Sequence, residues 1–170
     1  TALAIEKALP KAKATVMLRF WEDLNAALTS ALGRTPTVYG GKNLRNISTN
    51  YYDKSRGAKH VGIKCVIGKI NGEVLCLYVN VFNAIHYGLR VENASGSVVS
   101  RPEIKAKLRE QVDDGNAVAD KEPSWLVCYY HSPSPDQEPI VLNFDSFNGS
   151  VMRLFDEDER YAIIQNMVDH

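Results

Sequence analysis

The chain has 170 residues, 45% of them hydrophobic and 24% charged, and its formal net charge is zero. These values are typical of a single soluble globular domain that is long enough to bury a core. No apolar run approaches the roughly 18 residues that a membrane-spanning helix needs, and charged residues interrupt the start of the chain where a signal peptide would lie. We therefore expect a cytoplasmic protein with no membrane partner.

The zero net charge conceals an uneven distribution. Residues 34–69 contain eight Lys or Arg and one acid, Asp53, whereas residues 110–170 contain thirteen Asp or Glu and three Lys or Arg. Such asymmetry shapes the electric field that a partner meets, so it bears on partners rather than on the fold.

The first long element is a helix. Apolar residues recur every three or four positions from Val16 to Leu32, which predicts an amphipathic helix over residues 11–32. Gly33 would end this helix. Pro10 would separate it from a short leading segment, residues 2–9.

Residues 33–60 lack a periodic pattern and are rich in Gly, Asn and Ser. Only residues 37–39 and 50–52 look extended, so we predict a long connection with one or two short strands. Connections longer than about 12–15 residues are uncommon in compact domains and are often functional.

An antiparallel meander follows. Two β-rich runs, residues 61–70 and 73–82, flank Asn71-Gly72, and an Asn-Gly pair in this position is the strongest short-range hairpin signal. A second turn at Asn83-Ala84 would lead into a third strand, residues 85–91.

The rest of the chain alternates helices and strands. Ser100 and Glu103 form a capping-box pattern around Pro102, which predicts a helix that runs to about Val112. Residues 125–130 and 140–144 are predicted to form two more strands that pair with each other. Asp156 would cap the last helix, whose first turn is acidic; its predicted inner face consists of Ile163, Ile164, Met167 and Val168.

This order of elements predicts an α+β fold in which helices cover a mostly antiparallel sheet. We expect one domain over residues 1–170. Because the chain starts without Met and stops inside a helical pattern, we also expect it to be a piece of a longer protein.

No catalytic signature stands out, so we assign no catalytic residue, metal or cofactor. The Glu103-Ile104-Lys105 and Asp136-Gln137-Glu138 stretches resemble fragments of metal-nuclease motifs, but the first should lie on a helix surface and Pro139 replaces the lysine of the second. Three histidines show no spacing typical of metal ligands: His60, His86 and His131. The three cysteines lie inside apolar runs, as reduced core thiols do: Cys65, Cys76 and Cys128.

The candidate binding site is the stretch 34–69 with its excess of Lys and Arg, which we call the basic segment. Cations neutralise phosphates and aromatic rings stack on bases, and this segment interleaves both kinds of side chain. The alternative is a solvated loop that pairs inside the fold with the acidic last third of the chain. The candidate nucleic-acid-binding residues are Lys42, Arg45, Tyr51, Tyr52, Lys54, Arg56, Lys59 and Lys64.

Three stretches in the first half of the chain resemble a known family when taken together. The Phe-Trp pair in the segment 19–24, the Tyr-Tyr-Asp stretch at 51–53 and the start of the strand at 61–63 resemble the C-terminal accessory region of bacterial PD-(D/E)XK nuclease-type proteins, which look like restriction or phage-defence factors. The similarity covers roughly residues 15–92. It implies an accessory domain for recognition or assembly, since the nuclease carboxylates of that family would lie before Thr1.

Three functions follow from these observations. The first is a non-catalytic recognition or accessory domain of a bacterial nuclease-type defence protein, which contacts DNA, RNA or a phage-derived trigger through the basic segment. The second is a protein-interaction or oligomerisation domain. The third is an enzyme, such as a metal-dependent nuclease, with an unrecognised site near residues 51–64.

Overall fold

The fold is described from a computed structural model, which places residues 2–53, 60–110, 123–129 and 140–169. The helical elements are α1 (Ala2–Leu32), α2 (Leu44–Tyr52), α3 (Pro102–Arg109), α4 (Gly149–Met152), the short 3-10 helix η1 (Arg153–Phe155) and α5 (Glu157–Asp169). The strands are β1 (Thr37–Tyr39), β2 (Val61–Ile70), β3 (Glu73–Val81), β4 (Ile85–Glu92), β5 (Val98–Val99) and β6 (Val127–Tyr129).

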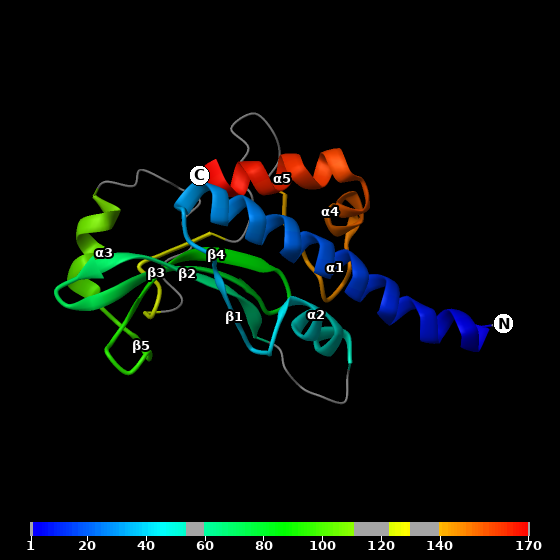
Figure 1. The fold of residues 1–170 in the computed structure, drawn as a ribbon, viewed down its shortest axis with the longest axis horizontal. Coiled ribbons are helices and arrows are strands. Elements are labelled where there is room, and N and C mark those ends of the chain that lie inside the picture. The colour runs from blue at the N-terminus through cyan, green and yellow to red at the C-terminus, as the bar shows by residue number, and fades with distance from the viewer. Residues whose placement is uncertain (1, 54–59, 111–122, 130–139, 170) are drawn as a thin grey trace.

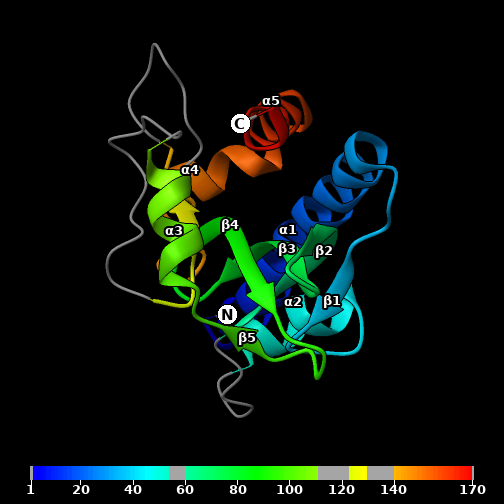
Figure 2. The same ribbon diagram turned by 90° about the vertical axis from the view of Figure 1, so that its left-hand side faces the viewer.

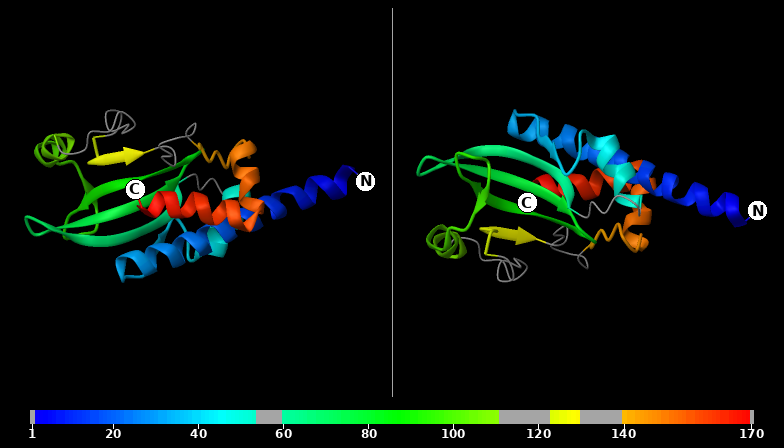
Figure 3. Two further views of the ribbon diagram at one scale, coloured as in Figure 1. Left: turned by 90° about the horizontal axis from the view of Figure 1, so that it is seen from above. Right: turned by 90° about the horizontal axis from the view of Figure 1, so that it is seen from below.

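The described strands form one antiparallel sheet in the order β1-β2-β3-β4-β5, with β6 also paired to β4. The helices α1 and α5 lie across one face of this sheet, which we call the helix face (Figure 1). Figure 2 shows α3 at one side of the sheet, and both views of Figure 3 show the N-terminal turns of α1 extending beyond the rest of the fold. The predicted α+β class is confirmed.

The main core lies between the helix face and α1. On α1 the residues expected at helical spacing are buried from Val16 to Leu28, but Leu32 at the end of the helix is 37% exposed, so the inward stripe ends one turn earlier than predicted. Phe20 and its neighbour Trp21 are both at 0% exposure. Phe20 packs at 5.6 Å between ring centroids on Phe144, and Ile63 and Val79 of the sheet join the same cluster. Burial of apolar surface of this extent is the main stabilising contribution in a domain of this size.

The opposite face of the sheet, which we call the outer face, is both polar and aromatic. Glu92 is 5% exposed there and accepts hydrogen bonds from the Lys64 ammonium, at 2.6 Å, and from the Tyr78 hydroxyl. The Arg90 guanidinium lies 3.8 Å from the centroid of the Trp125 ring. These three charged side chains are therefore paired or stacked within the fold.

The hairpin between β2 and β3 confirms the prediction made from Asn71-Gly72. Both turn residues have positive φ, 52° at Asn71 and 84° at Gly72, as a type I′ turn requires. The register places Ile70 opposite Glu73 and runs to Val61 opposite Val81, with one irregularity between Val66 and Gly68.

Substituting Gly72 by Ala is expected to lower the free energy of unfolding by about 1 kcal/mol, because an L-residue resists positive φ even where space is free. A Cβ at Gly72 would meet nothing within 4 Å, so the expected loss is conformational rather than steric. Gly68 is the matched control, since a Cβ there also meets nothing and its φ is not positive. In urea denaturation, equal losses in both variants would contradict the assigned turn.

The prediction about Pro10 was wrong, because α1 begins at Ala2 and continues through the proline. Proline has no backbone N–H, so the carbonyl of the residue four positions earlier receives no helical hydrogen bond from it. Here that residue is Glu6, and the described side chains of residues 4–6 and 8–10 are exposed, so water can bind the free carbonyl. The helix therefore bears the proline at its solvated end.

The prediction that residues 50–52 are extended was also wrong, because they end the helix α2, whereas residues 37–39 form the predicted strand β1. The Asn43 side chain accepts the Asn46 backbone N–H at 2.8 Å and so caps α2. Ile47 is fully buried against the core. Cap and burial outweigh the β-preference of the two tyrosines at the end of α2.

The helix predicted to begin at Ser100 differs from the prediction at both of its ends. The Ser100 hydroxyl donates to the Pro123 carbonyl at 3.0 Å instead of capping, so Arg101 stands at the N-cap position without a side-chain cap. The helix α3 ends at Arg109, before Val112, which lies outside the described residues.

Residues 140–144 do not form the predicted continuous strand, and Tyr130 of its predicted partner segment lies outside the described residues. Residues 140–144 cross the start of β4, where the Ile85 N–H donates to the Leu142 carbonyl at 2.9 Å and Ala84 forms an isolated bridge with Asn143. The Asn148 side chain binds the Val141 carbonyl, at 2.9 Å, and thereby occupies a backbone group that a strand ladder would use.

The last helix agrees with its prediction. The Asp156 carboxylate accepts the Glu159 N–H at 3.0 Å, and Ile163, Ile164 and Met167 are buried, while Val168 is half-buried. No helix in the described part of the chain is long and apolar enough to cross a membrane.

Candidate nucleic-acid interface

Two predicted contact residues, Lys42 and Arg45, lie at the start of α2 with exposed side chains. The Asn46 side chain accepts the Lys42 backbone N–H at 3.1 Å, and its own N–H is held by Asn43. This local network fixes the backbone from which the two cations extend into solvent.

The glycines before Lys42 have a packing role. Gly40 has φ of 76°, and a Cβ there would lie 2.4 Å from the His60 carbonyl oxygen. A Cβ on Gly41 would lie 2.6 Å from the Ile47 side chain. The tight passage explains the Gly-Gly pair by packing, and it places the backbone of Gly40, two residues before Lys42, against His60.

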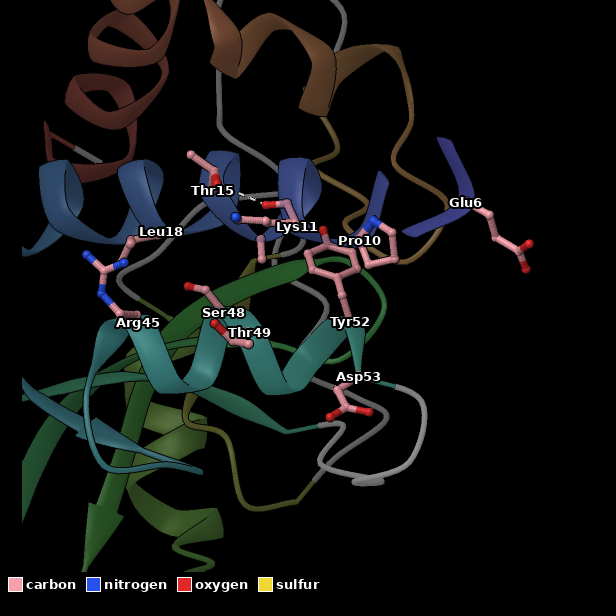
Figure 4. Close-up of a pocket in the computed structure, with 11 residues that line it drawn as sticks. Glu6, Pro10, Lys11, Thr15, Leu18, Arg45, Ser48, Thr49, Tyr52 and Asp53 are labelled. Carbon is pink, nitrogen blue, oxygen red and sulfur yellow. Dashed lines mark hydrogen bonds between the residues drawn. The ribbon is translucent and has the colours of Figure 1, made fainter. Parts of the chain in front are cut away.

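A groove of about 730 Å³ runs between α1 and α2. Figure 4 shows Arg45 at one end of it, beside Leu18, and shows Asp53 and Glu6 at the other end. Lys11 of α1 also lines the groove, so its charge is mixed. The positive part of the site is thus the end where α2 begins.

Tyr51 and Tyr52, also predicted to contact nucleic acid, are half-buried and bound to the fold. Their hydroxyls donate to the carbonyls of Phe82, at 2.7 Å, and of Phe144, at 3.0 Å. Burial raises the pKa of both hydroxyls above the ordinary value, and the charge of Asp145 adds to this effect. These two side chains anchor α2 to the end of β3 and to the segment around Phe144, so we leave them out of the interface.

Lys64 lies apart from Lys42 and Arg45. It is on the outer face of the sheet, where its ammonium pairs with Glu92. The alternative of internal pairing therefore holds for this lysine, although its partner belongs to β4 and not to the acidic last third of the chain. The remaining predicted contacts, Lys54, Arg56 and Lys59, lie outside the described residues.

The sequence pointed to only one member of an exposed pair of aromatic rings. His60 and Phe82 stack with 4.6 Å between ring centroids and 12° between ring planes, and both side chains are exposed. The sequence marks His60 as one of the rings in the basic segment, but it marks Phe82 only as the end of a strand. Their pairing depends on the β2–β3 register, which brings residues 22 positions apart to the same end of the sheet.

The side chains of His86 and the three cysteines are hydrogen-bonded or buried within the fold. The His86 ring is hydrogen-bonded to the Asn80 side chain at 2.8 Å, while His131 lies outside the described residues. The three cysteines are buried and free, as predicted, and burial raises the pKa of the Cys76 thiol to about 11. A thiol in that state is a poor nucleophile at neutral pH.

Only one of the carboxylates considered for metal binding, Glu103, lies in the part of the chain that the structure describes. Glu103 and Lys105 lie on α3, while Asp136 and Glu138 are outside the described residues. Within the described part of the chain, no group of three or more His, Cys, Asp or Glu could hold a metal ion.

Comparison with known proteins adds no assignment: no family model matches the sequence, and no curated protein and no solved structure matches the chain.

Proposed function

We propose that this domain is a non-catalytic recognition module that binds nucleic acid, as an accessory domain of a bacterial nuclease-type defence protein. The observation that carries the binding role is the exposure of Lys42 and Arg45 on a backbone that Asn43 and Asn46 hold in place, close in sequence to the point where Gly40 meets His60. The nuclease-type context rests on the resemblance of residues 15–92 alone.

The charge of the neighbouring sequence supports this role. Residues 42–64 contain six Lys or Arg and one acid, and three of these cations stand between Asp53 and His60. Cations that reach phosphates release condensed counterions, so binding of this kind weakens steeply as salt rises. Because Lys64 is paired with Glu92, we assign phosphate contacts to the other cations of the segment.

Replacing Lys42 and Arg45 together by Ala is expected to weaken DNA binding about tenfold at low salt and to reduce the slope of log K against log salt by about 2. Fluorescence anisotropy with labelled DNA at several salt concentrations measures both quantities. The fold should remain intact, since both side chains are exposed.

The matched control is the double change Lys69→Ala and Lys107→Ala, which removes the same charge from exposed positions on β2 and α3. If the control weakens binding as much as the Lys42/Arg45 variant, the binding reflects net charge and the proposed interface is wrong. If neither variant changes a measurable affinity, the interface also fails.

One observation favours a second function, protein interaction or self-association. The projecting N-terminal part of α1 exposes two large apolar side chains, Ile5 at 69% and Leu9 at 51%. Apolar side chains that project in this way are typical of interaction surfaces when they are clustered. A complex or oligomer that survives high salt, detected by light scattering, would support this function over binding to nucleic acid.

A further inference from the structure

The stacked rings of His60 and Phe82 form a flat aromatic surface at the end of the sheet where β2 begins and β3 has ended. The rings are nearly parallel, at 12°, and Phe82 is 38% exposed. An exposed pair with this geometry can extend its stack by one more planar ring, as bases do on aromatic side chains.

The backbone on both sides of the pair is held in place. The Phe82 carbonyl accepts the Tyr51 hydroxyl at 2.7 Å, and its N–H donates to the Ala84 carbonyl at 3.4 Å in a tight turn. The His60 carbonyl lies against Gly40. A surface that is already ordered loses little conformational entropy when a ligand binds to it.

Charges near the rings give the ligand a direction. The backbone of Gly40, two residues before Lys42, lies against the His60 carbonyl, and on the other side the Asp145 N–H donates at 3.1 Å to the carbonyl of Asn83, the residue after Phe82. A phosphate would be attracted on the Lys42 side and repelled on the Asp145 side. A nucleotide with its base on the rings would therefore place its phosphate toward the start of α2.

We propose that the His60–Phe82 pair is a stacking platform for an unpaired base, so that the ligand is single-stranded nucleic acid. This inference rests on the proposed function and names its substrate class. In a duplex each base face is covered by its neighbour, and only an unpaired base can place a free face on the rings. The phosphate contacts then supply charge neutralisation and the platform supplies the preference for single strands.

The test compares the affinities of the wild-type chain, Phe82→Leu and Phe82→Trp for labelled oligothymidine of about twelve nucleotides and for a duplex of equal length. We expect tighter binding of the single strand by the wild type. Phe82→Leu should weaken single-strand binding about tenfold without changing its salt slope, because stacking is lost while the cations remain. Phe82→Trp should keep the affinity, and equal melting temperatures would show that both variants are folded.

The outcomes separate this inference from the proposed function. If Phe82→Leu binds oligothymidine like the wild type while Lys42→Ala with Arg45→Ala does not, the platform is wrong and the phosphate interface stands. Equal wild-type affinity for the single strand and the duplex also overturns the platform. If the wild type binds neither probe at low salt, both proposals fail.

Discussion

Replacing Phe20 by Ala is expected to lower the free energy of unfolding by about 4 kcal/mol. The Phe20 side chain is at 0% exposure and packs on Trp21, at 5.3 Å between ring centroids, and on Phe144. It thus joins α1 to the segment that crosses the start of β4, and its removal would leave a cavity between elements far apart in the sequence. Urea denaturation followed by circular dichroism measures the loss.

Leu9→Ala is the matched control on the same helix, because Leu9 is 51% exposed and Ala suits a helix at least as well as Leu. Its expected effect is within about 0.5 kcal/mol. Phe20→Leu, with an expected loss of about 1 to 2 kcal/mol, keeps the comparison measurable if the Ala variant does not fold. Similar losses at positions 9 and 20 would contradict the position of α1 on the sheet.

The correct predictions from sequence rest on short-range chemistry. Asn71-Gly72 is enough to define a hairpin, since few residue pairs adopt positive φ twice in succession, and Asp156 is enough to cap α5. The errors arise where contacts between residues far apart in the sequence determine the secondary structure. Tyr51 and Tyr52 have β-preference. Ile47 is nevertheless buried in the core with residues of α1 and the sheet, and this burial holds the segment as helix.

The candidate site was less predictable than the fold for the same reason. Charge alone marks Lys42 and Lys64 as equivalent, but the strand register places Lys64 beside Glu92, 28 residues away, and leaves Lys42 exposed. The tyrosines of α2 show the same limit, because their hydroxyl partners lie on Phe82 and Phe144. Composition identifies a basic segment, whereas only the fold shows which of its side chains remain available.

Replacing Glu92 by Gln is expected to lower the free energy of unfolding at pH 7 by about 3 kcal/mol. The carboxylate is 5% exposed and accepts hydrogen bonds from Lys64 and Tyr78. When Gln replaces Glu92, the Lys64 ammonium loses its negatively charged partner. The Lys64 side chain is only 27% exposed, so water replaces that partner incompletely. The expected loss lies at the lower end of the range for broken buried pairs because water still reaches this lysine.

The effect of Glu92 should depend on pH in a defined direction. Burial alone would raise the pKa of Glu92, but the hydrogen bonds from Lys64 and Tyr78, the charge of Lys64 and a smaller contribution from Cys76 together outweigh burial and hold the pKa below its ordinary value of 4.5. A carboxyl group with a lowered pKa in the folded state stabilises the fold above the unfolded value, and this stabilisation is lost as pH falls through the folded value. The difference in stability between wild type and Glu92→Gln should therefore be constant near neutral pH and shrink below about pH 5.

Glu159→Gln is the control for this experiment, because the Arg153–Glu159 pair is also an ion pair but both side chains are more than 40% exposed. Its expected effect is below about 1 kcal/mol at neutral pH. Urea denaturation of the three proteins between pH 3 and pH 7 tests both expectations together. A difference for Glu92→Gln that stays constant down to pH 3, or that is no larger than the difference for Glu159→Gln, would show that the outer-face carboxylate is not held as a buried anion. The pairing of Lys64 with Glu92 would then no longer be a reason to exclude Lys64 from the nucleic-acid interface.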